Sequence, residues 1–565
     1  MNYRWINREC KDEDAVKQII SELNVPSPIA RVLVGRGIDT IDAVQRFFEP
    51  TLDKLHSPWL MDGMELAVDR IDKAIEAHEM IWIHGDYDVD GTASAAMVLH
   101  FLRKIGANAN YHIPSRLEEG FGFTPLSVER AREAGATVVV TVDVGVTASR
   151  AVDRANELGI DVIICDHHQA AEEIPNALTI LDPIKPGCDY PFKGLAACGV
   201  AFKLLQALSE RHGHPELAYE YLDFVAIASA ADIAPLIEEN RILSHFGLEL
   251  INSYPRPGFK GLVDCAGLHL GQLTNASVIF GLAPRINAAG RLGDPRRAVE
   301  MMIQPDELKA FRIAQELEHD NRQRRTIDEH TFEEASRQAE AQLISGSGRA
   351  LVLHSNDWHA GVIGIVASRL VEKYHVPSVM LTTIDGMAKG SARSVKDFDI
   401  HGALKQCEDL LIEFGGHKHA AGLSLNVDRI PELRERFDKI AADALTADML
   451  KPEIVIDADL QLNELTPSFF KFLAQFAPYG YKNHRPVFHT EHVVSANGVK
   501  IVGNNHLKLR ALQKNFAIDA IGFNLGHKIN DCSHGRPFSV VYTLEENLFN
   551  GSTTPQLRIK DLRPE

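Results

Sequence analysis

Short apolar runs that lead directly into acidic residues or histidines recur in the first half of the chain. They are Ile81 to Ile83 before His84-Gly-Asp-Tyr-Asp-Val-Asp-Gly91, Val138 to Val142 before Asp143, and Ile160 to Cys165 before Asp166-His167-His168. The stretches between the runs, 92–105, 125–134 and 147–158, have a helical pattern. This alternation predicts an α/β domain with buried, parallel strands.

The polar residues at these strand ends predict a metal site. Parallel strands end at one edge of their sheet, which is where open α/β sheets bind ligands. Five acids and three histidines at one edge would repel each other unless cations were bound. Carboxylates with one or two imidazoles suit Mn²⁺ or Mg²⁺, and so many acids exceed the needs of one ion. We therefore expect two divalent ions, and a pair of ions at one site is typical of phosphoester hydrolysis.

The spacing of the first polar block is compatible with such a pair of ions. In His84-x-x-x-Asp88-x-Asp90, alternate side chains can reach two neighbouring positions, and Asp143 on the adjacent strand can bridge them. An acid at a strand end can also cap the next helix. That alternative stays open for Asp86 and for Asp166 when each is taken singly.

Eight ordered blocks resemble the motifs of a known superfamily. The first four resemble those of the DHH phosphoesterases: His84 to Gly91, Val142 to Thr147, Asp166 to His168 and Ala230 to Leu236. The others resemble the RecJ branch, the bacterial single-strand-specific exonucleases: Pro284 to Arg291, Trp358 to Gly364, Gly390 to Ser394 and Gly415 to His417. Together the blocks span most of residues 80–420.

The resemblance implies a role for each polar residue. One ion would be held by His84, Asp88 and Asp143, and the other by Asp90, Asp143, His167 and Asp232. His168 would face the phosphate beside the catalytic residues Asp143 and His167, whereas the role of Asp86 in catalysis is left open. The expected phosphate-binding and strand-binding residues are Arg116, Arg285, Asn287, Arg291, His359, Ser391, Arg393, Gly416 and His417.

The resemblance also implies an activity and partners. A RecJ-like enzyme would hydrolyse single-stranded DNA from the 5′ end in recombination and repair, with Mn²⁺ or Mg²⁺ as cofactor. A single-strand-binding protein and a helicase would be its partners. Two alternatives are kept: a DHH-family oligoribonuclease or cyclic-dinucleotide phosphodiesterase, and a non-catalytic replication scaffold. Enzymes of the first kind are typically shorter and lack a C-terminal barrel, and degenerate scaffolds lose metal ligands.

Changes in composition and hydrophobic pattern along the chain predict five parts. Residues 1–60 read as a helical prefix packed against the main domain, and 61–305 as the DHH domain. Residues 306–345 lack Gly and Pro and have few apolar positions, which predicts a solvent-bridging helix up to roughly 60 Å long. Residues 346–450 read as a second α/β domain resembling DHHA1. Residues 451–565 have short strands typical of a small barrel, in the place where RecJ has an OB fold.

Composition narrows the class of protein further. The chain has 565 residues, 45% hydrophobic and 24% charged, as in large globular enzymes. Its seven cysteines, an odd number, argue against a disulfide framework. No signal peptide or membrane segment is recognisable, so the cytoplasm is expected. The net charge of −18 disfavours promiscuous duplex binding, although local charge decides binding in a narrow strand channel. In the barrel, Phe488 and Phe523 are either base-stacking or core residues.

Overall fold

The computed structural model describes residues 3–115, 119, 122–171, 173–345, 348–533, 535–549 and 552–565. The chain divides into two compact units. The smaller one comprises Met1–Trp5 and His319–Ile454, and the larger one comprises Ile6–Glu318 and Val455–Glu565. No helix within the described ranges is both long enough and apolar enough to cross a membrane.

A five-stranded parallel sheet, ordered β3-β2-β4-β5-β6, forms the centre of the larger unit. Its strands are β2 (Met80–Gly85), β3 (Asn108–His112), β4 (Ala136–Val142), β5 (Asp161–Cys165) and β6 (Thr179–Leu181). The predicted parallel arrangement of the three apolar runs is confirmed. The sequence pattern missed β3, which lies at an edge of the sheet with several polar residues, and β6, which has only three residues.

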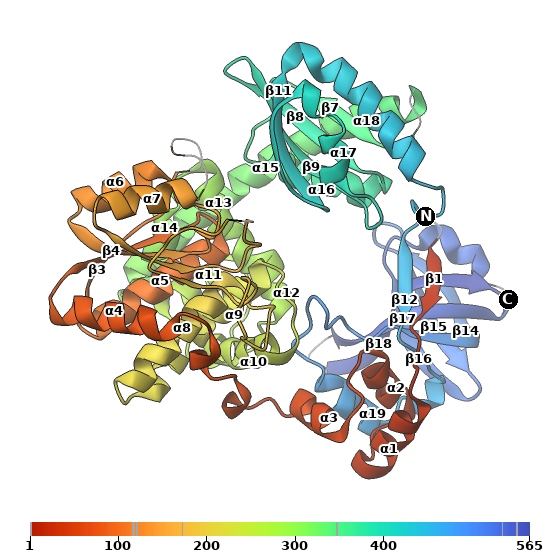
Figure 1. The fold of residues 1–565 in the computed structure, drawn as a ribbon. Coiled ribbons are helices and arrows are strands. Elements are labelled where there is room, and N and C mark those ends of the chain that lie inside the picture. The colour runs from red at the N-terminus through yellow and green to blue at the C-terminus, as the bar shows by residue number, and fades with distance from the viewer. Residues whose placement is uncertain are drawn as a thin grey trace. The chain divides into compact units, whose positions relative to one another are not determined.

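Both faces of this sheet are covered by helices. These are α4 (Met64–Glu76), α5 (Val89–Lys104), α6 (Pro125–Glu133), α7 (Ser149–Glu157) and α8 (Ala197–Arg211). Ile83 and Val140 point into the hydrophobic cluster that includes α5 and α8, whereas Trp82 and Val139 point into the cluster that includes α6 and α7. Figure 1 shows α6 and α7 on the side of the sheet opposite α5. Burial on both faces explains why the strands read as continuous apolar runs.

Further helices complete the domain and approach the ends of the strands. They are α9 (Leu222–Ala231), α10 (Glu238–Ser253), α11 (Pro257–Cys265), α12 (Asn275–Ser277), the π-helix η4 (Val278–Leu282), α13 (Ala283–Leu292) and α14 (Arg296–Ile303). A Cβ on Gly290 of α13 would lie 2.7 Å from the carbonyl oxygen of Tyr87. The glycine therefore lets α13 approach the first polar loop closely.

The predicted connector is one continuous helix, α15 (Glu307–Ser345) of 39 residues. At 1.5 Å per residue its length is roughly 58 Å. The expectation that solvent surrounds this helix is wrong, because Asn321, Thr331 and Ala335 are buried. The helix reads as polar because several of its buried positions carry polar side chains that are paired: Arg324 donates to the Oδ1 of Asn321 at 3.0 Å.

The smaller unit is built on a five-stranded mixed sheet, ordered β10-β11-β9-β8-β7. Its elements are β7 (Leu351–His354), α16 (Ile363–Tyr374), β8 (Ser378–Ile384), β9 (Met387–Arg393), α17 (Ile400–Lys405), β10 (Leu411–His417), β11 (Ala420–Asn426) and α18 (Ile430–Ala444). Only β7 and β8 are parallel to each other. The prediction of a second α/β domain is confirmed.

The C-terminal strands close into a barrel. The strands are β13 (Ala458–Asp459), β14 (Phe488–Val502), β15 (His506–Gln513), β16 (Phe516–Gly522), β17 (Phe538–Phe549) and β18 (Ser552–Pro564), with α19 (Pro467–Ala474) before β14. The order β14-β15-β16-β18-β17 closes through a pairing of β14 with β17. Phe488 is fully buried in the barrel core, whereas Phe523 is 45% exposed.

Smaller elements connect these parts. β1 (Arg4–Asn7) and β12 (Glu453–Ile456) form a two-stranded sheet. The short 3-10 helices are η1 (Leu52–Lys54), η2 (Pro58–Leu60), η3 (Pro215–Tyr221), η5 (Glu408–Leu410), η6 (Val427–Arg429), η7 (Leu462–Glu464) and η8 (Gly526–Asp531).

The N-terminal helices belong with the barrel. They are α1 (Glu13–Leu23), α2 (Ser27–Gly35) and α3 (Ile41–Phe48). Val16, Leu33 and Phe47 lie in the same hydrophobic cluster as Phe476 and Phe538, and Figure 1 shows these helices beside α19. The prediction that the prefix packs mainly against the DHH-like domain is therefore wrong. The helical pattern defines an apolar face, but it does not say which partner covers that face.

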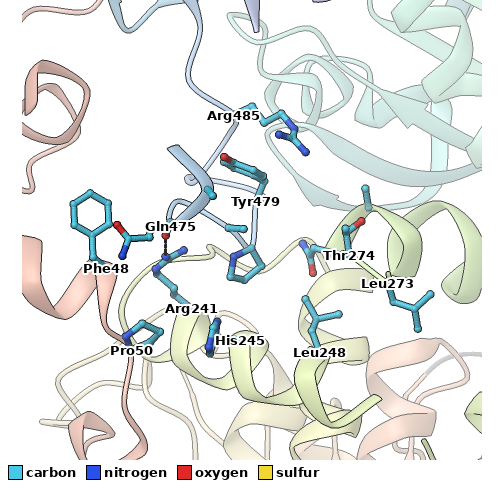
Figure 2. Close-up of a pocket in the computed structure, with 15 residues that line it drawn as sticks. Phe48, Pro50, Arg241, His245, Leu248, Leu273, Thr274, Gln475, Tyr479 and Arg485 are labelled. Atoms are coloured by element: carbon cyan, nitrogen blue, oxygen red, sulfur yellow. Dashed lines mark hydrogen bonds between the residues drawn. The ribbon is translucent and has the colours of Figure 1, made fainter. Parts of the chain in front are cut away.

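A buried arginine joins the prefix and the barrel domain to the parallel-sheet domain. Arg241 of α10 donates to the backbone oxygens of Phe47, Gln475 and Phe476 at 3.1, 2.7 and 2.9 Å. Its guanidinium also lies 4.0 Å from the centre of the Phe47 ring. Figure 2 shows Arg241 reaching towards Gln475. Burial lowers the pKa of Arg241 to about 10, which leaves the side chain charged at neutral pH.

A cavity of about 400 Å³ lies next to this arginine. Figure 2 shows its walls, which come from the prefix, from α10, from residues 273–276 and from the end of α19 with the segment that follows it. The lining contains Arg241, His245 and Arg485 but no Asp or Glu. The cavity is therefore separate from the acidic strand ends and is not the predicted metal site.

Replacing this arginine should loosen the junction. Arg241→Met keeps much of the side-chain volume but removes a donor from three carbonyl oxygens, of which that of Phe476 still accepts from the Nδ2 of Asn483 at 2.8 Å. We expect this loss to cost about 3–5 kcal/mol of unfolding free energy. Urea or thermal unfolding of the variant measures this loss. The matched control is Arg46→Met, which removes an exposed ion pair with Asp42 and should cost about 0.5 kcal/mol or less. Equal losses in the two variants would contradict the role of Arg241.

Candidate metal centre

The carboxyl ends of β2, β4 and β5 bring the predicted ligands together. Ligand atoms lie within 4.8 Å of one another in three groups: Asp86, Asp88 and Asp143; Asp90, His167 and Asp232; and Asp143, His167 and His168. The first two groups share no residue, and the third links them through Asp143 and His167. The structure therefore has two adjacent sets of candidate ligands at one edge of the sheet.

The loop after β2 is shaped by its glycine. A Cβ on Gly91 would lie 2.5 Å from the backbone nitrogen and oxygen of Asp86, so only glycine lets the loop fold back this tightly. Asp88 is the N-cap of α5 and accepts from the amide of Gly91 at 3.1 Å. The helix-capping alternative therefore falls on Asp88 and not on Asp86. Its second carboxylate oxygen leaves Asp88 able to bind a cation as well.

Asp143 is positioned by an uncommon backbone conformation. Its φ of 65° is left-handed, which Asp tolerates better than most residues. Its amide donates to the carbonyl oxygen of Cys165 at 3.0 Å, which extends the pairing of β4 and β5 to the site. Burial, together with the charges of Asp88 and Asp90, raises the pKa of Asp143 well above its usual range. A bound cation would remove this penalty.

In the second ligand group, Asp90 is held by the N-terminus of a helix and Asp232 lies at the open rim of the site. The carboxylate of Asp90 accepts from the amides of Ala197 and Cys198 at 2.8 Å each, at the start of α8. Burial nevertheless raises the pKa of Asp90. Asp232 lies at the open rim, where loss of hydration and the charge of Asp90 raise its pKa to about 8. The amides of α8 were missed at the sequence level, because backbone donors carry no residue signature.

His84 is close to this edge but belongs to none of the three ligand groups. It is fully buried, and its Nε2 lies 3.2 Å from the carbonyl oxygen of Gly122. Its Nδ1 has no hydrogen-bond partner within the described part of the chain. Burial lowers the pKa of His84 to about 3, which keeps the ring neutral and able to bind a metal. The assignment of His84 as a ligand stays a proposal, and Asp86 stands beside Asp88 and Asp143 instead.

His168 forms a charged pair with Asp166. Its Nδ1 lies 2.7 Å from the Oδ1 of Asp166, and this bond raises the pKa of His168 to about 9. The carboxylate of Asp166 also accepts from the amides of Val146 and His167. Although burial opposes it, these bonds lower the pKa of Asp166. The Nε2 of His168 is thus a protonated donor held near the metal ligands, suited to a phosphate oxygen.

The Pro284 block has two different roles in the larger unit. The Oδ1 of Asn287 accepts from the amide of Val89 at 3.2 Å, so this residue supports the loop that carries the metal ligands. Arg285 is buried and pairs with Glu318 at 2.7 Å. A guanidinium already paired in this way fixes α13 in place and is a weak candidate for phosphate. Arg291 lies half-buried at the end of α13.

The candidate phosphate residues of the smaller unit fall on its sheet. The Nη1 of Arg393 donates to the Oγ of Ser391 at 2.9 Å on β9. A Cβ on Gly364 would lie 3.0 Å from that Oγ and 3.2 Å from the Nη2 of Arg393. Two sequence blocks therefore meet at this point, and the small residue leaves room beside the guanidinium. The Nδ1 of His359 accepts from the amide of Gly361 at 3.0 Å.

The remaining candidates lie at an exposed turn or outside the described residues. Gly416 and His417 are exposed at the end of β10. Gly416 has a φ of 138°, and a Cβ there would meet the carbonyl oxygen of Ala420. Arg116 lies outside the described residues.

Comparison with known proteins agrees with this geometry. The chain matches the DHH family N-terminal domain over residues 80–229, the DHHA1 domain over 347–443 and the RecJ OB domain over 456–561. The parallel-sheet domain and its acidic edge are therefore those of a DHH-family protein.

The chain is also similar to whole proteins over almost its entire length. The chain is 36% identical to the single-stranded-DNA-specific exonuclease RecJ of Bacillus subtilis, over 97% of this chain and 70% of that protein. Crystal structures of Thermus thermophilus RecJ with Mn²⁺ and with Mg²⁺ superpose with TM-scores of 0.85 and 0.79, at 29% and 28% identity. Each covers 99% of this chain, and the chain covers 79% and 78% of theirs. This chain belongs to the RecJ family.

The raised pKa values predict how cations and protons compete at this edge. Acids with raised pKa values stabilise the fold when protonated, and this contribution is lost as pH rises towards about 8, the pKa of Asp232. Metal-free protein should therefore unfold at a lower temperature at pH 8 than at pH 6, and Mn²⁺ should raise the unfolding temperature more at pH 8. Thermal unfolding in EDTA and in Mn²⁺ measures both effects.

Asp232→Asn is the matched variant for this experiment. It removes one of the titrating groups at the rim, so part of the pH dependence of the metal-free protein should disappear. A Mn²⁺-induced shift of equal size at both pH values in the parent would contradict the competition between protons and ions.

Proposed function

We propose that this chain is a metal-dependent exonuclease that hydrolyses single-stranded DNA to nucleotides in the 5′-to-3′ direction. The main support is the convergence of Asp90, Asp143, His167 and Asp232 at one sheet edge. The relative named as a single-stranded-DNA-specific exonuclease supports the substrate. The polarity and a role in DNA recombination and repair are what the resemblance to the RecJ family implies.

We assign two divalent ions, Mn²⁺ or Mg²⁺, to the two ligand groups. Asp86 or His84, with Asp88 and Asp143, would hold one ion, and Asp90, Asp143, His167 and Asp232 would hold the other. Ions bound here supply a hydroxide nucleophile near neutral pH and neutralise charge on the phosphoryl group. The mutual repulsion of buried carboxylates is the observation that fits cation binding.

The neighbouring side chains would bind and orient the phosphodiester. Protonated His168, held by Asp166, donates from its Nε2 to a phosphate oxygen. Asp166 is the positioning residue of this pair because it accepts hydrogen bonds from the ring of His168 and from the backbone amide of His167. We propose further phosphate contacts from Arg116, Arg291, Ser391, Arg393 and the exposed turn at Gly416.

The C-terminal domain supports this function over the alternatives. The match to the RecJ OB domain favours long single strands over short oligoribonucleotides or cyclic dinucleotides. The exposed ring of Phe523, with the guanidinium of Arg558 5.1 Å from its centre, is suited to stacking with a base. Retention of all the expected ligands argues against a non-catalytic scaffold. We further propose that a single-strand-binding protein and a helicase act with this enzyme, in the cytoplasm where bacterial DNA lies.

Labelled substrates test the function directly. Single strands labelled at either end, blunt duplex, 5′-tailed duplex and short RNA are incubated with Mn²⁺ or Mg²⁺, and the product lengths are compared. We expect nucleotides from the 5′ end of single strands, shortening of a 5′ tail and little cleavage of blunt duplex. Preferential hydrolysis of short RNA, or release from the 3′ end, would refute the proposal.

Asp143→Asn should lower hydrolysis by about a thousandfold or more, because it weakens both proposed ion sites without changing volume. The fold should persist, and the metal-free variant should unfold at the same or a higher temperature because one repelling charge is gone. Asp42→Asn, an exposed change far from the strand ends, is the control and should keep full activity. Full activity of Asp143→Asn in saturating Mn²⁺ would exclude the two-ion assignment.

Arg393→Ala should weaken the binding of single strands about tenfold while the metal content stays unchanged, because it removes a charge-assisted phosphate contact and no metal ligand. Fluorescence anisotropy with labelled strands and metal analysis provide the two readouts. Arg429→Ala, which removes an exposed arginine of the same unit, is the control. Loss of metal from Arg393→Ala, or unchanged strand binding, would contradict the assignment.

A further inference from the structure

An isoleucine next to a metal ligand has a backbone conformation that isoleucine disfavours. Ile233 directly follows Asp232, and its φ is 57°, in the left-handed region. The other non-glycine residues with positive φ in the described part of the chain are Asn, Asp, His, Lys or Glu. Ile233 is thus the one apolar, β-branched residue among them, and such a residue is a true outlier in this region.

The conformation belongs to the helix terminus that carries the metal ligand. The amide of Ile233 donates to the oxygen of Ala230 at 3.3 Å, and the amide of Ala234 donates to that of Ser229 at 3.0 Å. These two bonds form a Schellman motif, in which the left-handed position is usually Gly or Asn. The motif orients Asp232 at the end of α9, but it does not require a branched aliphatic side chain.

The side chain of Ile233 is not used for core packing. It is 58% exposed, and it belongs to none of the hydrophobic clusters of the described residues. Its neighbour Asp232 lies within ligand distance of Asp90 and His167. Since consecutive Cα atoms are about 3.8 Å apart, the backbone of Ile233 lies close to this candidate ligand group.

We infer that Ile233 packs against a base of the single strand next to the scissile phosphate. Each reaction places a phosphodiester at the metal centre, so the nucleotides on either side pass the residues that flank the ligands. The candidate ligands beside it are carboxylates and imidazoles, and an exposed isoleucine offers apolar contact to the face of any base without reading its sequence. A strained residue that contributes nothing to the core is consistent with such a functional contact. The inference rests on the proposed exonuclease activity.

The test separates the effect of the Ile233 side chain from the effect of its backbone conformation. Asn adopts the left-handed region readily, so Ile233→Asn should unfold at the same or a higher temperature and bind the same amount of Mn²⁺. Loss of the apolar contact should raise KM for single strands about tenfold, with kcat changed less than about twofold. Ile233→Val should keep most of the affinity, and Ile233→Gly should behave as Ile233→Asn.

A matched control tests the backbone effect alone. His78 ends α4 with the same pair of bonds, from His78 to Ile75 and from Glu79 to Ala74, and has a φ of 54°. His78→Asn should leave KM unchanged, because His78 lies on an exposed turn that carries no ligand.

Abasic strands identify the contact. Strands with one abasic nucleotide at successive positions from the 5′ end are compared between the parent and Ile233→Asn. At one position the parent should lose affinity and the difference between the two proteins should vanish. A difference that persists at every position, an unchanged KM, or a loss of metal or stability in Ile233→Asn would overturn the inference. Failure of the parent to degrade unmodified single strands would instead refute the proposed function.

Discussion

Repulsion among carboxylates at the end of a parallel sheet is the constraint on which the rest of this structure depends. Asp90 and Asp143 are almost fully buried and lie beside Asp86, Asp88 and Asp232. Burial disfavours the charged form of each, and the neighbouring charges add to this effect, so their pKa values rise. Such an arrangement is stable at neutral pH when cations compensate the charges. The sheet, the helix N-terminus at α8 and the glycine loop after β2 all serve to hold these acids together.

Two left-handed residues lie at this edge, and they show how the fold positions side chains where regular structure ends. Asp143 turns away from β4 at a φ of 65°, and Ile233 turns away from α9 at 57°. One places a carboxylate that belongs to two of the candidate ligand groups, and the other places an apolar residue next to Asp232. Strain at such positions is tolerated because the surrounding strands and helices are rigidly packed.

Residues that lie far from the candidate ligands in the sequence support the structure of the metal centre. Asn287 bonds to the amide of Val89, and Gly290 permits the close approach of α13 to the loop of Tyr87. Farther away, Arg241 ties the prefix and the barrel domain to the parallel-sheet domain through backbone oxygens. Asn287 and Arg241 are thus polar residues that have structural partners within the protein. Arg285, expected at a phosphate and found with Glu318, is the clearest example.

The sequence by itself determined the parallel strands, the order of the domains, the long helix and most of the metal edge. These follow from local periodicity and from the rule that parallel strands end together, so residues such as Asp143 and His167 could be placed without tertiary information. Only the tertiary structure decided that the prefix shares the barrel core, that α15 buries polar residues, and that Asp86 stands nearer than His84 to the ligand group of Asp88. The reason is physical. The sequence does not show which group will contact an apolar face, a charge or a backbone amide, because packing brings those partners together.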